Sequence, residues 1–268
     1  MRGWSMPHKL TEIISWSDQC AKAQRYFDTY GWPDNRQEAW KYTSLAHLQD
    51  SAFTTADTDD KAGAADIQGT LDGLIINISG GEAQLPPKQA LGGGISVTDI
   101  RTDDALRAAI FSQLADNHLL TALSALHQTS AIAVDIEATA NGSDTAPIIL
   151  NMTGGNKDAA CYPFVIVRVH KGARGRIAEI HSSQAGLSCP LMVYDVQDNA
   201  ELHHIRLQKE ADHTTHLGLN QMQMGKNSQI NSFAISMGGA LSRLETHSLF
   251  QDTDSPVSYT HLTLPTKA

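Results

Sequence analysis

The feature that most constrains the fold is a turn-and-strand pattern that recurs in the second half of the chain. The segment DNAELHHI at 198–205 aligns with KNSQINSF at 226–233, 28 positions later, and a looser copy covers 172–180. In each copy a polar turn with Gly or Asn leads into a short strand. Turns that recur every 20 to 30 residues or so are typical of a β-solenoid, whose coils stack on one another. The repeat alone leaves a β-sandwich with similar turns open as the alternative.

Short apolar or alternating runs dominate the chain from Ala131 onward, which indicates an all-β region. Helix-length periodic segments do not interrupt these runs, which argues against a doubly wound α/β sheet. The runs expected to form strands are AIAVDIEA, APIILNM, YPFVIVRVH, RIAEIHSS, PLMVYDV, AELHHIRL and SQINSFAI.

The first half is expected to be helical at its start and mixed afterwards. A helical pattern runs from Thr11 to Phe27 and stops at Gly31 and Pro33. A second helix is predicted from Asp104 to about His127, with Thr102 or Asp103 as its N-cap. Short strands are expected at 71–78 and 95–97. The expected divisions are a helical region and linker (1–70), a mixed α/β segment (71–130), a β-helix core (131–256) and a tail (257–268).

Composition excludes several classes of protein. The chain has 20 Lys and Arg against 29 Asp and Glu, a formal charge of −9, which argues against nucleic-acid and membrane-surface partners. Its three cysteines form no Cys-x-x-Cys pair, so a disulfide framework or zinc ribbon is not supported. Without a signal-peptide pattern or an apolar run of about 20 residues, the expected location is the cytoplasm.

The common catalytic motifs are missing. Gly225-Lys226 is followed by Asn227 and no spaced glycines precede it, so no phosphate-binding loop is present. A Gly-x-Ser-x-Gly elbow is also absent. We therefore assign no catalytic, cofactor-binding or metal-binding residue and expect a protein that is not an enzyme.

Histidines supply the alternative, a β-fold metalloprotein enzyme that uses the region of His203, His213 and His216. His203 and His204 are adjacent, so on a strand they point to opposite faces and at most one of them joins the others. Surface or ladder positions are the more common fate of such histidines.

Two further sets of residues invite a functional interpretation. Glu179 and Glu201 could act as paired carboxylates of a carbohydrate-active β-helix, although solvent-facing strand positions are the favoured reading. Cys161 and Cys189 lie beside strand runs, where core packing is favoured over cluster ligation. Trp40 and Tyr42 are expected to pack a helical element against the body of the domain rather than to contact a partner.

Four segments together resemble SufD, a subunit of the Suf iron–sulfur cluster assembly machinery in the SufB/SufD family. Their order and spacing match that family, from about Thr11 to Ser248, and the first favours SufD over SufB. The segments are NRQEAWKYTSL (35–45), Gly172-Ala173 with AEIH (178–181), AELHHIRLQ (200–208) and SMGGALSR (236–243).

The resemblance implies a right-handed β-helix core with helical regions before and after it. It also implies a non-catalytic scaffold that pairs with SufB through the β-helix and binds the ATPase SufC. A nascent Fe–S cluster would be assembled transiently by the complex, and no cofactor would be firmly bound by this chain.

The end of the sequence departs from the family. The family continues past residue 268 with the helices that bind SufC, so the resemblance implies a truncated chain with weak or absent SufC binding. Residues 257–268, VSYTHLTLPTKA, resemble translated adaptor sequence that contaminates assembled reads. We therefore expect a non-native tail and a β-helix that is incomplete at its C-terminal end.

Overall fold

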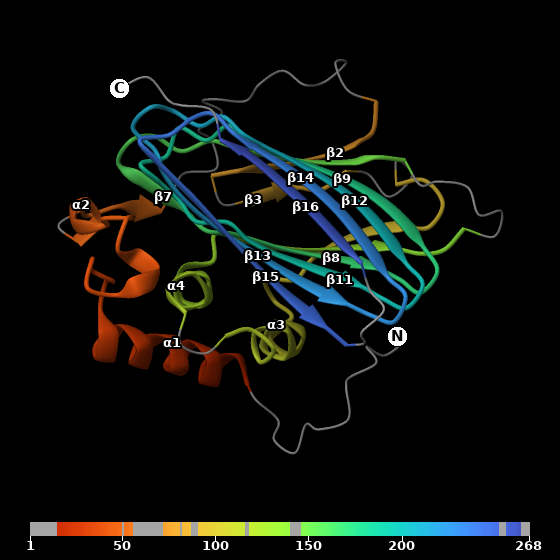
Figure 1. The fold of residues 1–268 in the computed structure, drawn as a ribbon, viewed down its shortest axis with the longest axis horizontal. Helices are drawn as coiled ribbons and strands as arrows, with labels where there is room; N and C mark the ends of the chain where they lie inside the picture. The colour runs from red at the N-terminus through yellow and green to blue at the C-terminus, as the bar shows by residue number, and fades with distance from the viewer. Residues whose placement is uncertain are drawn as a thin grey trace.

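The chain folds into a β-solenoid of about four turns that alternates between two largely parallel sheets (Figure 1). The computed structural model describes residues 15–49, 51–55, 72–80, 82–86, 91–115, 118–139, 146–251 and 256–263. The solenoid with N-terminal helices confirms the predicted fold class, and the parallel pairing excludes the sandwich alternative.

The first sheet, which we call sheet A, carries one strand from each coil. Its main strands pair parallel, and β4 joins the edge antiparallel to β5. Three short strands, β1, β7 and β10, extend it. The strands are β1 (Thr54–Thr55), β4 (Ile95–Asp99), β5 (Ser130–Ile136), β7 (Ala159–Cys161), β8 (Pro163–Val169), β10 (Leu187–Ser188), β11 (Leu191–Val196), β13 (Thr215–Met224) and β15 (Leu241–Phe250).

The second sheet, sheet B, supplies the other side of each coil. Its strands pair parallel except for β3, which is antiparallel to β2. They are β2 (Leu74–Ser79), β3 (Glu82–Gln84), β6 (Ile148–Thr153), β9 (Arg174–His181), β12 (Glu201–Gln208), β14 (Gln229–Ser236) and β16 (Val257–Thr263).

The predicted repeat is the stacking period of the coils. Glu201 pairs with Gln229, 28 positions later, which is the offset that the sequence repeat shows. The corners from sheet A to sheet B span four residues in three successive coils, at 170–173, 197–200 and 225–228. The third residue of each has a positive φ: 71° at Gly172, 57° at Asn199 and 53° at Asn227. Gly and Asn adopt this conformation at low cost, which explains why they recur in the sequence pattern.

The interior between the sheets changes character along the solenoid. In the early coils it is apolar, with Ile148, Leu150 and Met152 on β6. Leu150 pairs with Glu179 on β9, and Glu179 pairs with Arg206 on β12. The inward position that holds an aliphatic side chain in the coil of β6 therefore holds an ionisable side chain in each of the next two coils.

Helices cover the outer face of sheet A (Figure 1). Phe111 of α3 packs edge-on against Phe164 of β8, with ring centroids 5.2 Å apart. α1 begins with a capping box between Ser15 and Asp18. The helices are α1 (Trp16–Tyr30), the 3₁₀ turn η1 (Glu38–Trp40), α2 (Ala46–Gln49), α3 (Asp104–Phe111) and α4 (Leu119–His127).

The single helix predicted from Asp104 to His127 is wrong, because the structure has two helices there. Asp103 is the N-cap of α3, as expected, and its carboxylate accepts from the backbone N–H of Leu106. Ser112 ends α3 and donates its hydroxyl to the carbonyl of Ala109. Ser, Asp and Asn compete with helical backbone bonds, and they cluster at 112–117. The predicted helix start at 11–14 lies outside the described residues.

The last described strand, β16, pairs parallel with β14 from Ile230↔Val257 to Ser236↔Thr263. The corner before it spans 251–256, so the four-residue rule of the earlier corners does not hold there. The foreign origin of 257–268 stays a prediction. Of the helices in the described ranges, not one has the length and apolar character that a membrane crossing requires.

Candidate functional site

A buried polar network fills the interior of the later coils, with the Glu179 carboxylate at its centre. Nε2 of His204 donates to Oε1 over 2.7 Å, and the Tyr194 hydroxyl donates to the same oxygen. Nε2 of His181 donates to Oε2 over 2.7 Å, and Nε of Arg206 donates to it over 3.2 Å. A carboxylate can only accept, so these contacts place the protons on the imidazole Nε2 atoms.

The network continues through Arg206 into a second buried carboxylate. Nη2 of Arg206 lies 2.5 Å from Nε2 of His216, and Nδ1 of His216 lies 2.6 Å from Oε2 of Glu210. Because the guanidinium can only donate, His216 accepts at Nε2 and carries its proton on Nδ1. Gly218 makes room for this contact, since a Cβ there would lie 2.9 Å from the Nε2 atom of His216. A continuous chain of polar contacts thus joins the two carboxylates.

The protonation states follow from burial and pairing. Burial alone would raise the pKa of Glu179, but its contacts with His204 and His181 outweigh this and hold that pKa well below its usual range. Burial and the charge of Arg206 lower the pKa of His181 to about 4. Burial would also raise the pKa of Glu210, but His216 brings it down to about 2. At neutral pH both carboxylates are ionised and His181 is neutral.

Three side chains of this network are of the types that ligate metal ions. Ligand atoms of His181, Glu210 and His216 lie within 4.8 Å of one another. The guanidinium of Arg206, however, occupies the Nε2 side of His216 at 2.5 Å. A fixed positive charge at that distance opposes a cation, so the arrangement favours an internal ion-pair network over a metal centre.

The alternative histidine site at His203, His213 and His216 does not form. His203 lies on the outer face of β12 and donates to Glu201 over 2.8 Å, whereas His216 is fully buried on the inner face of β13. His213 lies in an exposed loop and donates to the carbonyl of Gln184. Side chains on opposite faces of a coil cannot ligate one ion. The expectation that His203 and His204 point to opposite faces is confirmed.

The solvent-facing position predicted for Glu179 is also wrong, because its side chain is completely buried. Glu201 remains on the outer face, where it pairs in register with Arg174 rather than with Glu179. The two carboxylates therefore cannot form a catalytic pair. Alternation along the strand gave the period of two, but the sequence did not show which face of RIAEIHSS points inward.

Cysteine packing is as expected. Cys161 and Cys189 are buried on neighbouring coils, and the backbone N–H of Cys189 donates to the carbonyl of Cys161. Burial raises the pKa of the Cys189 thiol well above its usual value. Since iron ligation requires the thiolate, this environment favours a packing role.

The two aromatic residues of the N-terminal segment differ in burial. Trp40 is buried, and the guanidinium of Arg243 on β15 stacks on its ring at 4.2 Å, which confirms a packing role. Tyr42 is 89% exposed, so the expectation that it packs against the domain is wrong.

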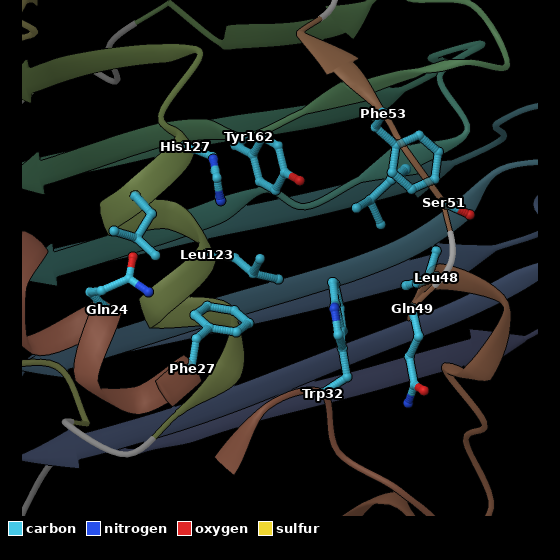
Figure 2. A pocket seen from close by; sticks show the side chains of 12 residues that line it. Gln24, Phe27, Trp32, Leu48, Gln49, Ser51, Phe53, Leu123, His127 and Tyr162 are labelled. Atoms are coloured by element: carbon cyan, nitrogen blue, oxygen red, sulfur yellow. The ribbon is translucent and has the colours of Figure 1, made fainter. Parts of the chain in front are cut away.

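A cavity of about 440 Å³ lies between the N-terminal helices and sheet A (Figure 2). The rings of His127 and Tyr162 lie 5.2 Å apart on one wall. Burial lowers the pKa of His127 and raises that of Tyr162, so both side chains are neutral at pH 7. The lining is Gln24, Phe27, Trp32, Leu48, Gln49, Ser51, Phe53, Leu123, Leu126, His127, Tyr162 and Leu187. Such a wall suits an apolar or aromatic group better than a cluster.

Comparison with known proteins identifies the region that contains the polar network. Residues 151–268 match the family model described as SUF system FeS cluster assembly, SufBD core domain. The match begins in β6 and includes β9, β11, β12 and β13, which carry Glu179, Tyr194, His204 and His216. The search of curated proteins found no match. Residues 151–268 are therefore similar to the SufBD core domain of the Fe–S cluster assembly family, which supports a role in that process.

Proposed function

We propose that the protein is a non-catalytic scaffold subunit of the SUF system, of the SufD type, that pairs with SufB in the cytoplasm; the ATPase SufC is the partner of the full-length family. The observation that carries this proposal is the SufBD core match over 151–268. The Fe–S cluster is the cargo of the whole complex and not a resident cofactor of this chain.

The N-terminal segment supports SufD rather than SufB. Its Trp-Lys-Tyr-Thr sequence at 40–43 is the part that resembles SufD, and it lies against the solenoid. Nη1 of Arg243 donates to Oγ1 of Thr43 over 3.2 Å, in addition to the stacking on Trp40. The segment is thus part of the folded body.

The paired state of the interior groups supports a non-catalytic role. Glu179, Arg206 and Glu210 are held by one another and by histidines, and all three are buried. A group that performs acid–base or nucleophilic chemistry must reach its substrate. These groups instead stabilise the stacking of the coils.

The outer face of sheet B is the surface that suits SufB. Helices cover the outer face of sheet A, but Ile205 on β12 and Phe233 on β14 are 55% and 37% exposed. The two residues are register partners, so their side chains lie side by side on one face. Neighbouring exposed apolar side chains are typical of a protein-interaction site.

Co-expression with affinity-tagged SufB and untagged SufC tests the proposal. We expect the chain to co-purify with SufB and the double variant Ile205→Glu/Phe233→Glu to lose this association. Tyr42→Ala is the matched control, because it removes an exposed aromatic side chain from outside the solenoid. Failure of the unaltered chain to associate with SufB would refute the pairing. If the double variant still associates with SufB, the contact with SufB lies on another surface.

A further inference from the structure

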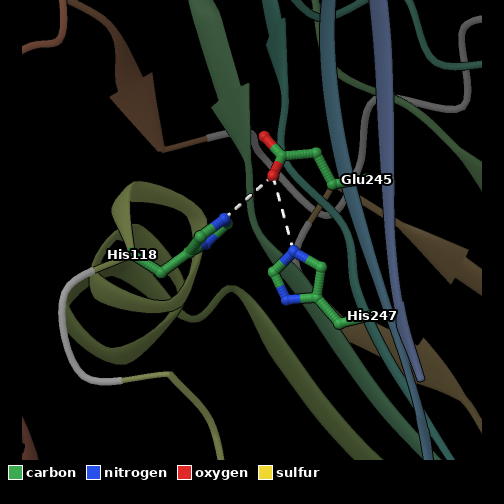
Figure 3. A group of neighbouring side chains, drawn as sticks. All are labelled: His118, Glu245 and His247. Atoms are coloured by element: carbon green, nitrogen blue, oxygen red, sulfur yellow. Dashed lines mark hydrogen bonds and ion pairs between the residues drawn. The ribbon is translucent and has the colours of Figure 1, made fainter. Parts of the chain in front are cut away.

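A second group of ligand-type side chains lies outside the solenoid interior, where α4 meets β15 (Figure 3). His118 immediately precedes α4, and Glu245 and His247 lie two residues apart on the same face of β15. Nε2 of His118 is 3.0 Å from Oε2 of Glu245, and Nε2 of His247 is 3.6 Å from the same oxygen. Three donor atoms from two separate elements thus converge on one point.

We propose that His118, Glu245 and His247 form a binding site for a divalent first-row transition-metal ion such as Zn²⁺ or Fe²⁺. Two imidazoles and one carboxylate are the protein ligands of many catalytic zinc and non-haem iron sites. A four-coordinate ion with bonds of 2.0–2.1 Å or so sets its ligand atoms about 3.3 Å apart. The two measured distances, 3.0 and 3.6 Å, lie on either side of that value.

The carboxylate is held so that one oxygen faces the histidines. Nε of Arg243 donates to Oε1 of Glu245 over 2.8 Å, and Arg243 is itself fixed by Trp40 and Thr43. Oε2 is therefore the oxygen left for His118 and His247. Burial would raise the pKa of Glu245, but the hydrogen bonds from His118 and Arg243 lower it to about 2. The carboxylate is ionised at neutral pH, as a metal ligand must be.

Exposure separates this site from the buried network. His247 is 38% exposed, while His118 and Glu245 are 15% and 17% exposed. An ion can therefore enter from solvent, and water can complete its coordination. Arg243 binds the far oxygen of the carboxylate, whereas in the interior Arg206 contacts the imidazole of His216 directly. This inference does not depend on the proposed SUF role.

The chain contains a matched control for the site. Glu201 and His203 on β12 repeat the Glu-x-His spacing of Glu245 and His247, with a contact of 2.8 Å. The third group beside Glu201 is Arg174 at 3.5 Å instead of a second histidine. This pair has the Glu-x-His spacing of the proposed site without its third ligand.

The test uses the full chain without a histidine tag, stripped of metal by a chelator and titrated with Co²⁺ as a spectroscopic probe. We expect one equivalent to bind with visible d–d absorption and Zn²⁺ to displace it. His247→Gln and His118→Gln should weaken binding at least about tenfold, the loss seen when even an outer-shell partner is removed. His203→Gln should leave binding unchanged.

Two results would overturn the proposal: no stoichiometric Co²⁺ or Zn²⁺ binding by the unaltered chain, or binding that His203→Gln removes and His247→Gln retains. Circular dichroism establishes that each variant is folded. Because His247 is the most exposed of the three ligands, His247→Gln decides the question even where His118→Gln does not fold.

Discussion

Glu179 and His204 lie on neighbouring strands of the solenoid interior, with Nε2 of His204 2.7 Å from Oε1 of Glu179 and both side chains completely buried. They are 25 positions apart in the sequence, on β9 and β12. An isolated buried carboxylate is costly, so its partners on the next coil are required for its presence there. The contact therefore makes each of these two coils depend on the other.

Glu179→Gln keeps the shape of the side chain and removes its charge. Arg206 then remains as a buried cation without its carboxylate, so the free energy of unfolding should fall by about 3–5 kcal/mol. Urea denaturation measures this change. Glu201→Gln is the control on the solvent side of β12 and should cost less than about 1 kcal/mol. Equal losses for the two variants would contradict the network described here.

Acidification should destabilise the protein in two steps. The pKa of His181 is about 4 in the folded protein and 6.5 ordinarily, so between these values the unfolded chain binds a proton that the folded chain does not. The free energy of unfolding therefore decreases as pH falls from 6.5 to about 4. Glu210 adds a loss between 4.5 and about 2, since its folded pKa is depressed.

Urea denaturation at a series of pH values tests this prediction. His181→Gln should flatten the dependence in the upper window, because the group that titrates differently is gone. His203→Gln, which removes an exposed histidine, should leave the dependence as it is. If His181→Gln leaves the pH dependence of the free energy of unfolding unchanged, another group is responsible for it.

The left-handed corners give a prediction about backbone conformation. Asn199 has a φ of 57°, so Asn199→Ala should reduce stability by about 1–2 kcal/mol. Asn199→Gly should be nearly neutral, because glycine adopts positive φ freely. Thermal unfolding of the two variants side by side gives the comparison. Equal losses for Gly and Ala would mean that the Asn side chain, and not the backbone conformation, holds the corner.

Trp40 should be the main contact between the N-terminal segment and β15. Trp40→Ala removes a buried aromatic ring under Arg243 and should cost about 3–5 kcal/mol. Tyr42→Ala, only two residues away but exposed, should change stability by less than about 0.5 kcal/mol. Chemical denaturation of both variants measures the difference, and similar costs would exclude the packing role of Trp40.

The coils could be predicted from the sequence because their period depends on local features, namely turn residues and alternating strands. Turn residues such as Asn199 and Asn227 recur wherever the backbone needs a positive φ, and the strands between them alternate. β13 and β15 were not among the predicted strands. β13 is buried along its whole length, yet it contains His216, Asn220 and Gln221, so its sequence lacks the apolar pattern of a buried strand.

The candidate sites could not be predicted in the same way, because they depend on register across coils. Alternation placed His203 and His204 on opposite faces without showing which one enters the interior. Glu179 is buried only because partners from the next coil meet it there, and the sequence does not show that stacking. His118 and Glu245 are 127 positions apart and meet through packing of α4 on sheet A.

The two sets of corners in the solenoid should differ in how well they tolerate inserted residues. From β8 to β14 the corner from sheet A to sheet B always has four residues, so an inserted residue at 197–200 would displace the left-handed turn and shift every later coil. The opposite corners differ in length: six residues at 209–214 and four at 237–240. A peptide grafted between Asp212 and His213, the exposed residues of that corner, should therefore be displayed with the buried Glu210 and Thr214 left in place, so this is the position to attach a label or a new binding loop.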